Sequence, residues 1–209
     1  MCYHVLNRGN NQAEIFHSAA DYAHFIKLLS VAQERISMEV FAACLMPNHF
    51  HIVLRPARGE DLGAWIQWLM TSHVRHYHKK YQSSGRVWQG RFKAFPIQED
   101  RHLLTVMRYV ERNALTAQLV GRAEDWQWGS LRWRINSMRK FVISPSPIQL
   151  PSQWTEYVNA PQTAAEAKIL RECIHRQRPY GETGWVEVTA HALALGSSMR
   201  AVGRPRKTQ

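Results

Sequence analysis

Two histidines separated by one phenylalanine are the residues whose types and spacing suggest chemistry most directly. His49, Phe50 and His51 follow the turn-type pair Pro47-Asn48 and begin a short apolar run. Alternate side chains of a β-strand share a face, so both imidazoles are expected on one side and Phe50 on the other. Two neighbouring imidazoles on a strand suit a divalent metal ion. The alternative is a pair of ordinary exposed strand histidines.

A tyrosine and an asparagine form a second candidate group. Tyr109 and Asn113 lie four residues apart in a helix predicted over residues 99–113, and they share a face with His102. A phenol can act as a nucleophile, an amide oxygen can bind a metal ion, and an imidazole can carry a proton. The alternative is that Tyr109 lies at the rim of an amphipathic helix and Asn113 caps its end.

The composition narrows the class of protein. The 209 residues include 27 Lys and Arg against 16 Asp and Glu, a formal net charge of +11, which points to nucleic acid or to a merely basic soluble protein. With 45% hydrophobic and 11% aromatic residues, the chain is not a disordered tail. The longest apolar run, residues 40–46, is far shorter than the roughly 20 residues that span a bilayer, and no signal peptide opens the chain. Three widely spaced cysteines exclude a disulfide scaffold or a Cys-rich zinc module and suit a reducing cytoplasm.

Basic residues gather in two places that are candidates for DNA binding. Arg75, Lys79 and Lys80 lie on a helix predicted over residues 62–81, where two tyrosines add aromatic surface that can stack on bases. The alternative for this helix is a solvated charged face.

The second basic segment is near the end of the chain. Residues 203–207, Gly-Arg-Pro-Arg-Lys, are similar to the core of an AT-hook, in which a Gly-Arg-Pro segment enters the minor groove of A·T-rich duplex. Arg204, Arg206 and Lys207 are therefore candidate DNA contacts.

Periodicity and turn residues predict the elements that must position these groups. Strands are predicted over residues 3–8, 14–16, 39–46, 49–54 and 87–97, and helices over residues 19–35, 62–81, 99–113 and 163–177. Ser18 is suited to cap the first helix. Residues 144–152 have the composition of a linker, and the composition changes after Asp125. We therefore expect a catalytic domain over residues 1–125 and a C-terminal extension over residues 126–209.

Four blocks of sequence, in order along the chain, match one known family together. They are Tyr3-His-Val-Leu-Asn-Arg-Gly-Asn10, Met46-Pro-Asn-His-Phe-His-Ile-Val-Leu54, Trp88-Gln-Gly-Arg-Phe-Lys93 and Tyr109-Val-Glu-Arg-Asn-Ala-Leu115. The chain resembles the REP-associated tyrosine transposases, which are relatives of the single-tyrosine insertion-sequence transposases. Both belong to the HUH endonuclease superfamily, named for its His-hydrophobic-His motif. The resemblance covers about residues 3–125 and continues weakly beyond them.

The resemblance implies a role for each of the candidate residues. His49, His51 and Asn113 match the metal ligands, which would hold Mg²⁺ or Mn²⁺, and Tyr109 matches the nucleophile. Arg8 and Arg91 match recurrent residues that contact DNA or support the structure. The other nearby tyrosines, at positions 77 and 81, match no such block.

The activity implied is that of a DNA transposase or endonuclease with a tyrosine nucleophile. It would cut and rejoin single-stranded DNA at REP-type hairpins through a 5′-phosphotyrosine link, which conserves the phosphodiester energy so that rejoining needs no ATP. The alternatives are a mobile insertion-sequence transposase with the same chemistry and a DNA-binding regulator that does not cut. The expected partners are single-stranded DNA and DNA hairpins, with no membrane, for a monomer or homodimer in the bacterial cytoplasm, associated with the nucleoid.

The fold expected is α+β. We predict an antiparallel sheet of four to five strands, of the ferredoxin-like kind found in HUH nucleases, with helices packed mainly on one side. The histidines should lie on a central strand with the tyrosine helix beside them. A mostly helical C-terminal extension completes the prediction.

Overall fold

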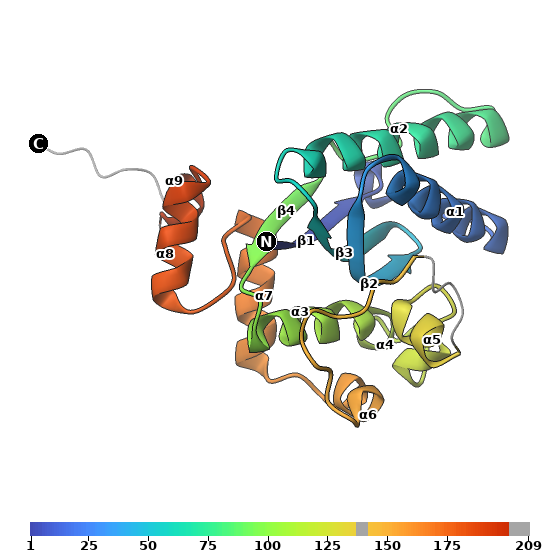
Figure 1. Ribbon diagram of the computed structural model, residues 1–209. Coiled ribbons are helices and arrows are strands. Elements are labelled where there is room, and N and C mark those ends of the chain that lie inside the picture. The colour runs from blue at the N-terminus through green and yellow to red at the C-terminus, as the bar shows by residue number, and fades with distance from the viewer. Residues whose placement is uncertain (137–141, 201–209) are drawn as a thin grey trace, which may run out of the picture.

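The computed structural model describes residues 1–136 and 142–200, and its centre is a four-stranded antiparallel sheet (Figure 1). The strands run in the order β2-β3-β1-β4, so the strand that carries the histidine pair is central. This confirms the predicted α+β class. The strands are β1 (Cys2–Arg8), β2 (Met38–Met46), β3 (His49–Pro56) and β4 (Lys93–Ile97).

Helices cover both faces of the sheet, which corrects the expectation that they lie mainly on one. Helices α1 (Ala19–Arg35) and α2 (Asp61–Tyr81) pack on one face, and α3 (Arg101–Glu111) packs on the other (Figure 1). The remaining helices are η1 (Asn10–Gln12), α4 (Asn113–Thr116), η2 (Ala123–Asp125), α5 (Ser130–Ile135), α6 (Trp154–Asn159), α7 (Ala164–Arg176), α8 (Thr183–Ala192) and α9 (Gly196–Met199).

The alternation of side chains along β3 separates two cores. Phe50, Ile52 and Leu54 are fully buried in the core against α1 and α2. His51 and Val53 face the other way, toward α3. Each strand residue sends its side chain to the face opposite that of its neighbour, so the apolar residues hold β3 in register while the histidines stay on the α3 face.

The predicted hairpin between β2 and β3 is present. Met46 pairs with His49, so Pro47 and Asn48 form the two-residue connection. On the other side of β3, Arg8 pairs with His49 and Leu6 pairs with His51. The register therefore places the end of β1 beside the histidine pair.

Two of the predicted strands differ from the structure. Residues 14–16 form no strand, because the amides of Ile15 and Phe16 both donate to the carbonyl of Pro47 while their side chains enter the α1/α2 core. The strand predicted over residues 87–97 begins only at Lys93. Before it, Trp88 forms an isolated bridge to Gly9, and the chain turns at Gly90, whose φ is +67°.

Gly9 is required at the end of β1 by a close approach of the backbone. A Cβ at this position would lie 2.2 Å from the carbonyl oxygen of Ala13, and the Gly9 amide donates to the carbonyl of Asn48. Any larger residue would push the end of β1 away from Ala13 and Ile15.

The C-terminal extension is mostly helical, as expected, and it shares both cores with residues 1–125. Trp128 and Trp133 are buried in the α1/α2 core, whereas Leu131 and Trp154 are buried in the α3 core. Gly129 forms a bridge with Cys44 of β2. The division of the chain at residue 125 remains a proposal about which part carries the chemistry.

A buried carboxylate ties α3 to this extension. Glu111, at the end of α3, accepts hydrogen bonds from Ser130 Oγ at 2.6 Å and from Trp154 Nε1 at 2.6 Å, and Arg134 lies 3.2 Å away. A buried charge is tolerated only with such partners, so this network fixes the end of the helix that carries the candidate tyrosine.

Two further observations concern the cysteines and the character of the helices. Cys2, Cys44 and Cys173 are buried and unpaired, so none of them forms a disulfide. Across residues 1–136 and 142–200, no helix has both the length and the apolar character needed to cross a membrane.

Candidate active site

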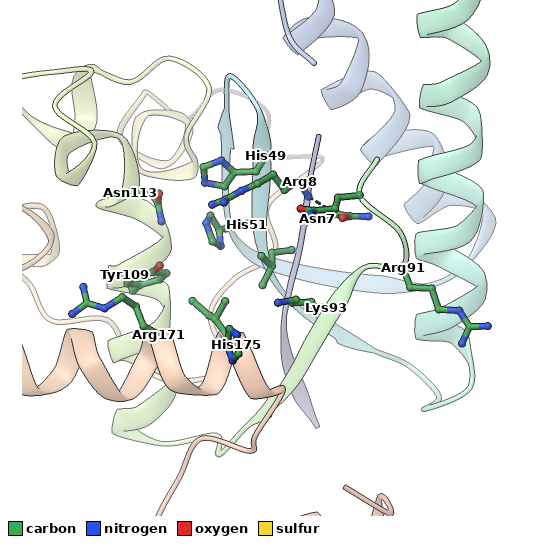
Figure 2. Close-up of a pocket in the computed structure, with 13 residues that line it drawn as sticks. Asn7, Arg8, His49, His51, Arg91, Lys93, Tyr109, Asn113, Arg171 and His175 are labelled. Carbon is green, nitrogen blue, oxygen red and sulfur yellow. Dashed lines mark hydrogen bonds between the residues drawn. The ribbon is translucent and has the colours of Figure 1, made fainter. Parts of the chain in front are cut away.

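A cavity of about 720 Å³ lies where the end of β1, the start of β3, α3 and α7 meet (Figure 2). Tyr109 and Asn113 reach it from one side and His49 and His51 from the sheet, so the four residues predicted to carry the chemistry share one cavity. Among the described residues, the cavity is lined by Leu6, Asn7, Arg8, His49, His51, Gln89, Arg91, Lys93, Tyr109, Asn113, Arg171, Ile174 and His175.

The hydrogen bonds around His49 determine which ring nitrogen faces the cavity with a lone pair. Asn48 Nδ2 donates to the carbonyl of Gln12 at 2.9 Å, which orients the amide so that Oδ1 faces His49 Nδ1 at 2.6 Å. An amide oxygen only accepts, so His49 Nδ1 carries the proton and Nε2 keeps its lone pair. Burial, with Arg8 nearby, lowers the pKa of His49 to about 4, so the ring is neutral at pH 7. This is the form that binds metal ions.

His51 has a different partner, a second histidine buried in the sheet. His51 Nδ1 lies 2.9 Å from Nε2 of His4, and the two rings are stacked. Burial lowers the pKa of His4 to about 3 and that of His51 well below its ordinary value, so both rings are neutral. In this hydrogen bond one ring donates its N–H and the other accepts with a lone pair.

Metal binding requires one direction of that hydrogen bond. His51 can offer Nε2 only if its proton is on Nδ1, where it donates to His4 Nε2. His4 then carries its own proton on Nδ1, an atom that is buried without a hydrogen-bond partner in the described part of the chain. The opposite direction would point His51 Nε2–H at the cavity and exclude a metal ligand.

The donor set fits a divalent ion. Two imidazole nitrogens, from His49 and His51, and the amide of Asn113 converge on the cavity, and Asn113 interacts with both His49 and Tyr109. Within the described residues, no group of three His, Cys, Asp or Glu is placed to hold a metal ion, so a third protein donor at this site would be of another type, such as the amide of Asn113. Imidazole and amide ligands are compatible with Mn²⁺ and Mg²⁺ and leave positions for phosphate and water.

Tyr109 is held at the edge of the α3 core. Its neighbours Val106, Met107 and Val110 are fully buried against the sheet, which turns the Tyr109 ring toward the histidines, at right angles to His51 with centroids 5.7 Å apart. Burial raises the pKa of Tyr109, while Asn113, Arg171 and Arg8 lower it. The net pKa is raised, so the phenol is protonated at neutral pH, and its attack requires compensation by positive charge.

Arg171 and His175 line this cavity, although the sequence did not predict them as site residues. Both lie on α7, more than 60 residues after Tyr109 in the chain, and Figure 2 shows Arg171 beside Tyr109. The only signal in the sequence was a helix predicted over residues 163–177 with cations on it, and nothing local connects that helix to Tyr109. Asn7 and Lys93, from β1 and β4, also line the cavity without having been singled out.

The residues predicted to contact DNA lie in different parts of the structure. Arg8 and Arg91 both line the cavity, although in Figure 2 the guanidinium of Arg91 points away from Tyr109. Arg204, Arg206 and Lys207 lie outside the described residues.

Arg75, Lys79 and Lys80 lie on α2, on the opposite face of the sheet from Tyr109 (Figure 1). Arg75 and Lys79 are exposed there.

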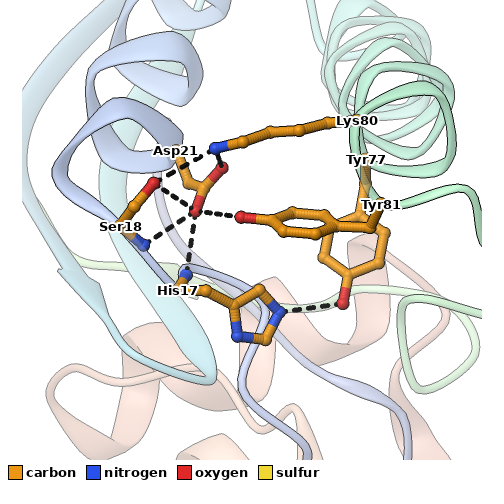
Figure 3. Close-up of polar contacts among 6 residues, drawn as sticks. All are labelled: His17, Ser18, Asp21, Tyr77, Lys80 and Tyr81. Atoms are coloured by element: carbon orange, nitrogen blue, oxygen red, sulfur yellow. Dashed lines mark hydrogen bonds and ion pairs between the residues drawn. The ribbon is translucent and has the colours of Figure 1, made fainter.

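Lys80 has a partner within the chain (Figure 3). Its Nζ lies 2.5 Å from Oδ1 of Asp21, a buried carboxylate near the start of α1, and Tyr81 donates to Oδ2 of the same carboxylate at 2.7 Å. Tyr77 and His17 form a neighbouring hydrogen bond of 2.9 Å. This cluster holds the end of α2 to α1, and neither tyrosine lies among the residues of the Tyr109 cavity.

His102, the suggested proton carrier, is also engaged elsewhere. Its Nδ1 lies 2.6 Å from Oδ1 of Asp100, which also accepts the His102 amide and so caps α3. His102 does not line the Tyr109 cavity.

Comparison with known proteins identifies the class. Residues 1–113, more than half of the chain, match the sequence model of the family described as Transposase IS200 like. The chain therefore belongs to the family of IS200-like transposases. A curated relative from Haemophilus influenzae (strain Rd), named "Putative REP-associated tyrosine transposase", is 28% identical over 108 residues, which span 46% of this chain and 61% of that protein.

A solved structure shares the fold. It is a REP-associated tyrosine transposase bound to a REP hairpin, similar with a TM-score of 0.53 and 13% identity over 78% of this chain and 92% of the other. At this identity the likeness establishes the fold and leaves the function to be argued from the site.

Proposed function

We propose that the protein is a metal-dependent endonuclease and strand transferase for single-stranded DNA, acting on REP-type hairpins through a 5′-phosphotyrosine intermediate. One observation carries the proposal: His49, His51, Tyr109 and Asn113 converge from β3, α3 and α4 on one cavity that also contains Arg8 and Arg171. The family match and the names of the relatives support the same reading.

His49, His51 and Asn113 would hold the divalent ion, Mg²⁺ or Mn²⁺. When bound, it would supply positive charge to a non-bridging oxygen of the scissile phosphate. The neutral state of His49 and His51 at pH 7 is what such a role requires, since a protonated imidazole cannot ligate.

Tyr109 would act as the nucleophile. Its Oη forms a bond to phosphorus as the bond from phosphorus to the 3′-oxygen breaks, and the phenol loses its proton while the leaving oxygen gains one. The products are a 5′-phosphotyrosine link and a free 3′-OH. Arg8 and Arg171 offset the phosphate charge that would otherwise repel Tyr109.

The reverse reaction joins strands. A free 3′-OH attacks the phosphotyrosine and releases Tyr109, so the number of phosphodiester bonds is conserved and no ATP is consumed. A tyrosine in place of an activated water is the feature that distinguishes strand transfer from hydrolysis.

The test is covalent capture. The protein is incubated with Mn²⁺ and a labelled single-stranded oligonucleotide that forms a hairpin, and adducts are resolved on a denaturing gel. We expect an adduct that Tyr109→Phe abolishes while DNA binding remains. Tyr77→Phe, on the opposite face of the sheet, is the matched control and should keep the adduct.

Binding of the hairpin without any adduct would favour the alternative of a non-catalytic regulator. The other alternative, a mobile insertion-sequence transposase, shares the chemistry. The long C-terminal extension favours the REP-associated branch, and hairpin repeats flanking the gene would distinguish the two.

Single-stranded DNA and DNA hairpins are thus the proposed partners, for a monomer or homodimer in the bacterial cytoplasm, associated with the nucleoid. Light scattering of the protein with and without the hairpin measures its mass and decides between one copy and two.

A further inference from the structure

A second cavity, of about 430 Å³, adjoins the Tyr109 cavity. Arg171 and His175 of α7 line both cavities, so the two are neighbours across one face of this helix. The described lining of the second cavity is strongly positive, with Glu172 as the one acid there beside Lys168, Arg171, Arg176 and Arg178.

The cations of this face have no counter-ions among the residues that the structure describes. The side chains of Lys168, Arg171 and Arg178 form no ion pair and no hydrogen bond there, and Lys168 and Arg171 are exposed. Some arginines elsewhere have ion pairs, as Arg55 has with Glu39 and Glu99. Uncompensated like charges repel one another, and a polyanion removes that repulsion.

The charge is not explained by the helix dipole. Cations favour the last turn of a helix, which accounts for His175 and Arg176. Lys168 and Arg171 lie in the first half and the middle of α7, where the helix dipole does not stabilise a positive charge. The helix dipole therefore does not account for Lys168 and Arg171.

The helix is held firmly against the sheet. Leu170 and Cys173 are buried in the α3 core. After the helix, Tyr180 pairs with the edge strand β4: its amide donates to Pro96 at 2.9 Å, and its carbonyl accepts from Gln98 at 3.0 Å. The cationic face is therefore a fixed part of the cavity wall.

We propose that the face formed by Lys168, Arg171 and His175 of α7 and by Arg178, which follows the helix, binds the phosphates of the single strand that continues out of the Tyr109 cavity. The inference rests on the proposed function and adds the C-terminal extension to its DNA-binding site. From Lys168 to His175 the helix rises about 10 Å, which exceeds the spacing of about 3.4 Å per phosphate along one strand of duplex. The face thus reaches more than one phosphate.

The test measures binding in the Tyr109→Phe background, so that the covalent step does not enter. Fluorescence anisotropy is recorded at several salt concentrations with three labelled oligonucleotides: a hairpin with a single-stranded 5′ flank, one with a 3′ flank, and the bare hairpin. The variants are Arg171→Gln, Lys168→Gln and Arg171→Lys. Lys27→Gln, an exposed cation on α1 across the sheet, removes the same charge as a control.

We expect Arg171→Gln to weaken binding about tenfold for one flanked hairpin and to lower the slope of log affinity against log salt by about 0.7, the value for one phosphate of a single strand. Arg171→Lys should retain most of the affinity, and Lys27→Gln should change little. The flank that is sensitive identifies the direction in which the strand leaves.

Two results would overturn the inference. In one, Arg171→Gln and Lys168→Gln match Lys27→Gln for both flanks. In the other, the loss is equally large for the bare hairpin, which would assign the face to the duplex stem. Adduct formation by the parent chain is scored separately, so a failure of the Tyr109 chemistry is distinguishable from a failure of the α7 site.

Discussion

The two faces of the sheet carry similar side chains with opposite states of pairing. On the α1/α2 face, the carboxylate of Asp21 is surrounded by Lys80, Tyr81 and Ser18, and Tyr77 bonds to His17 (Figure 3). Each of these polar groups has a hydrogen-bond or ion-pair partner within the chain. Such a cluster stabilises the fold and leaves few free donors or acceptors for a ligand.

In the Tyr109 cavity, on the α3 face, several polar groups lack such partners. The lone pair of His49 Nε2 and the guanidinium groups of Arg8 and Arg171 all reach a cavity without a counter-ion in the described residues. A tyrosine beside cations is thus present on both faces, but Lys80 is paired with Asp21, whereas Arg8 and Arg171 have no counter-ion among the described residues. Four experiments would break or sharpen this contrast.

The largest expected difference is between the two tyrosines. Tyr109→Phe should lower the rate of adduct formation by more than about 10³-fold, because no other hydroxyl in the cavity can replace a lost nucleophile. Tyr81→Phe should leave the rate within about twofold and lower only the melting temperature. Rapid-quench gels and thermal melts measure the two effects. Equal loss in both variants would contradict the contrast.

The second experiment compares two buried histidines, one on each face. Burial lowers the pKa of both His4 and His73 to about 3, and Nδ1 of each ring has no hydrogen-bond partner among the described residues. His4→Phe removes the acceptor for His51 Nδ1–H and should weaken Mn²⁺ binding about 10–100-fold. His73→Phe should not change it. Calorimetric titration with Mn²⁺ measures both, and His4→Gln, which can restore an acceptor, should recover part of the loss.

The third concerns acid stability on the α1/α2 face. The pKa of His73 is lower in the folded chain than the ordinary value of about 6.5, so its protonation favours the unfolded state as the pH falls from about 6.5 toward 3. At pH 5 this costs about 2 kcal/mol. His73→Phe should therefore lose less stability between pH 7 and 5 than the parent, as measured by urea unfolding. An identical pH dependence would show that His73 is not the group responsible.

The smallest effect is expected at Asp21. Its hydrogen bonds to Tyr81 and Ser18 and its pairing with Lys80 hold the pKa of the carboxyl well below its usual range. Stability from this carboxylate is present above the unfolded pKa of about 3.9 and is lost as the pH falls through and below it.

Asp21→Asn should accordingly cost about 1–2 kcal/mol at pH 7 and much less near pH 3, while affinity for the hairpin stays unchanged. Urea unfolding at both pH values and anisotropy measure this. A clear fall in DNA affinity would mean that the α1/α2 cluster also serves binding.

Local patterns were enough to predict much of the site. The two-residue turn at Pro47-Asn48 and the alternation of His49 and His51 follow from the strand period, and Tyr109 and Asn113 follow from the helix period. The cavity brings these residues together, while their chemical roles stay proposals. The boundaries of the strand at Lys93 could not be predicted, since the bend at Gly90 depends on Trp88 pairing with Gly9.

The alternation within β3 and the spacing within α3 are properties of a few consecutive residues, so the amino-acid sequence alone decided that the candidate ligands share a face and that Tyr109 lies one turn from Asn113. Only the tertiary structure decided that Lys80 pairs with Asp21, 59 residues away, and that Arg171 lines the same cavity as Tyr109. The physical reason is that the pairing of a charged side chain is not encoded in the spacing of neighbouring residues. It depends on which distant element packs against that side chain in the folded protein.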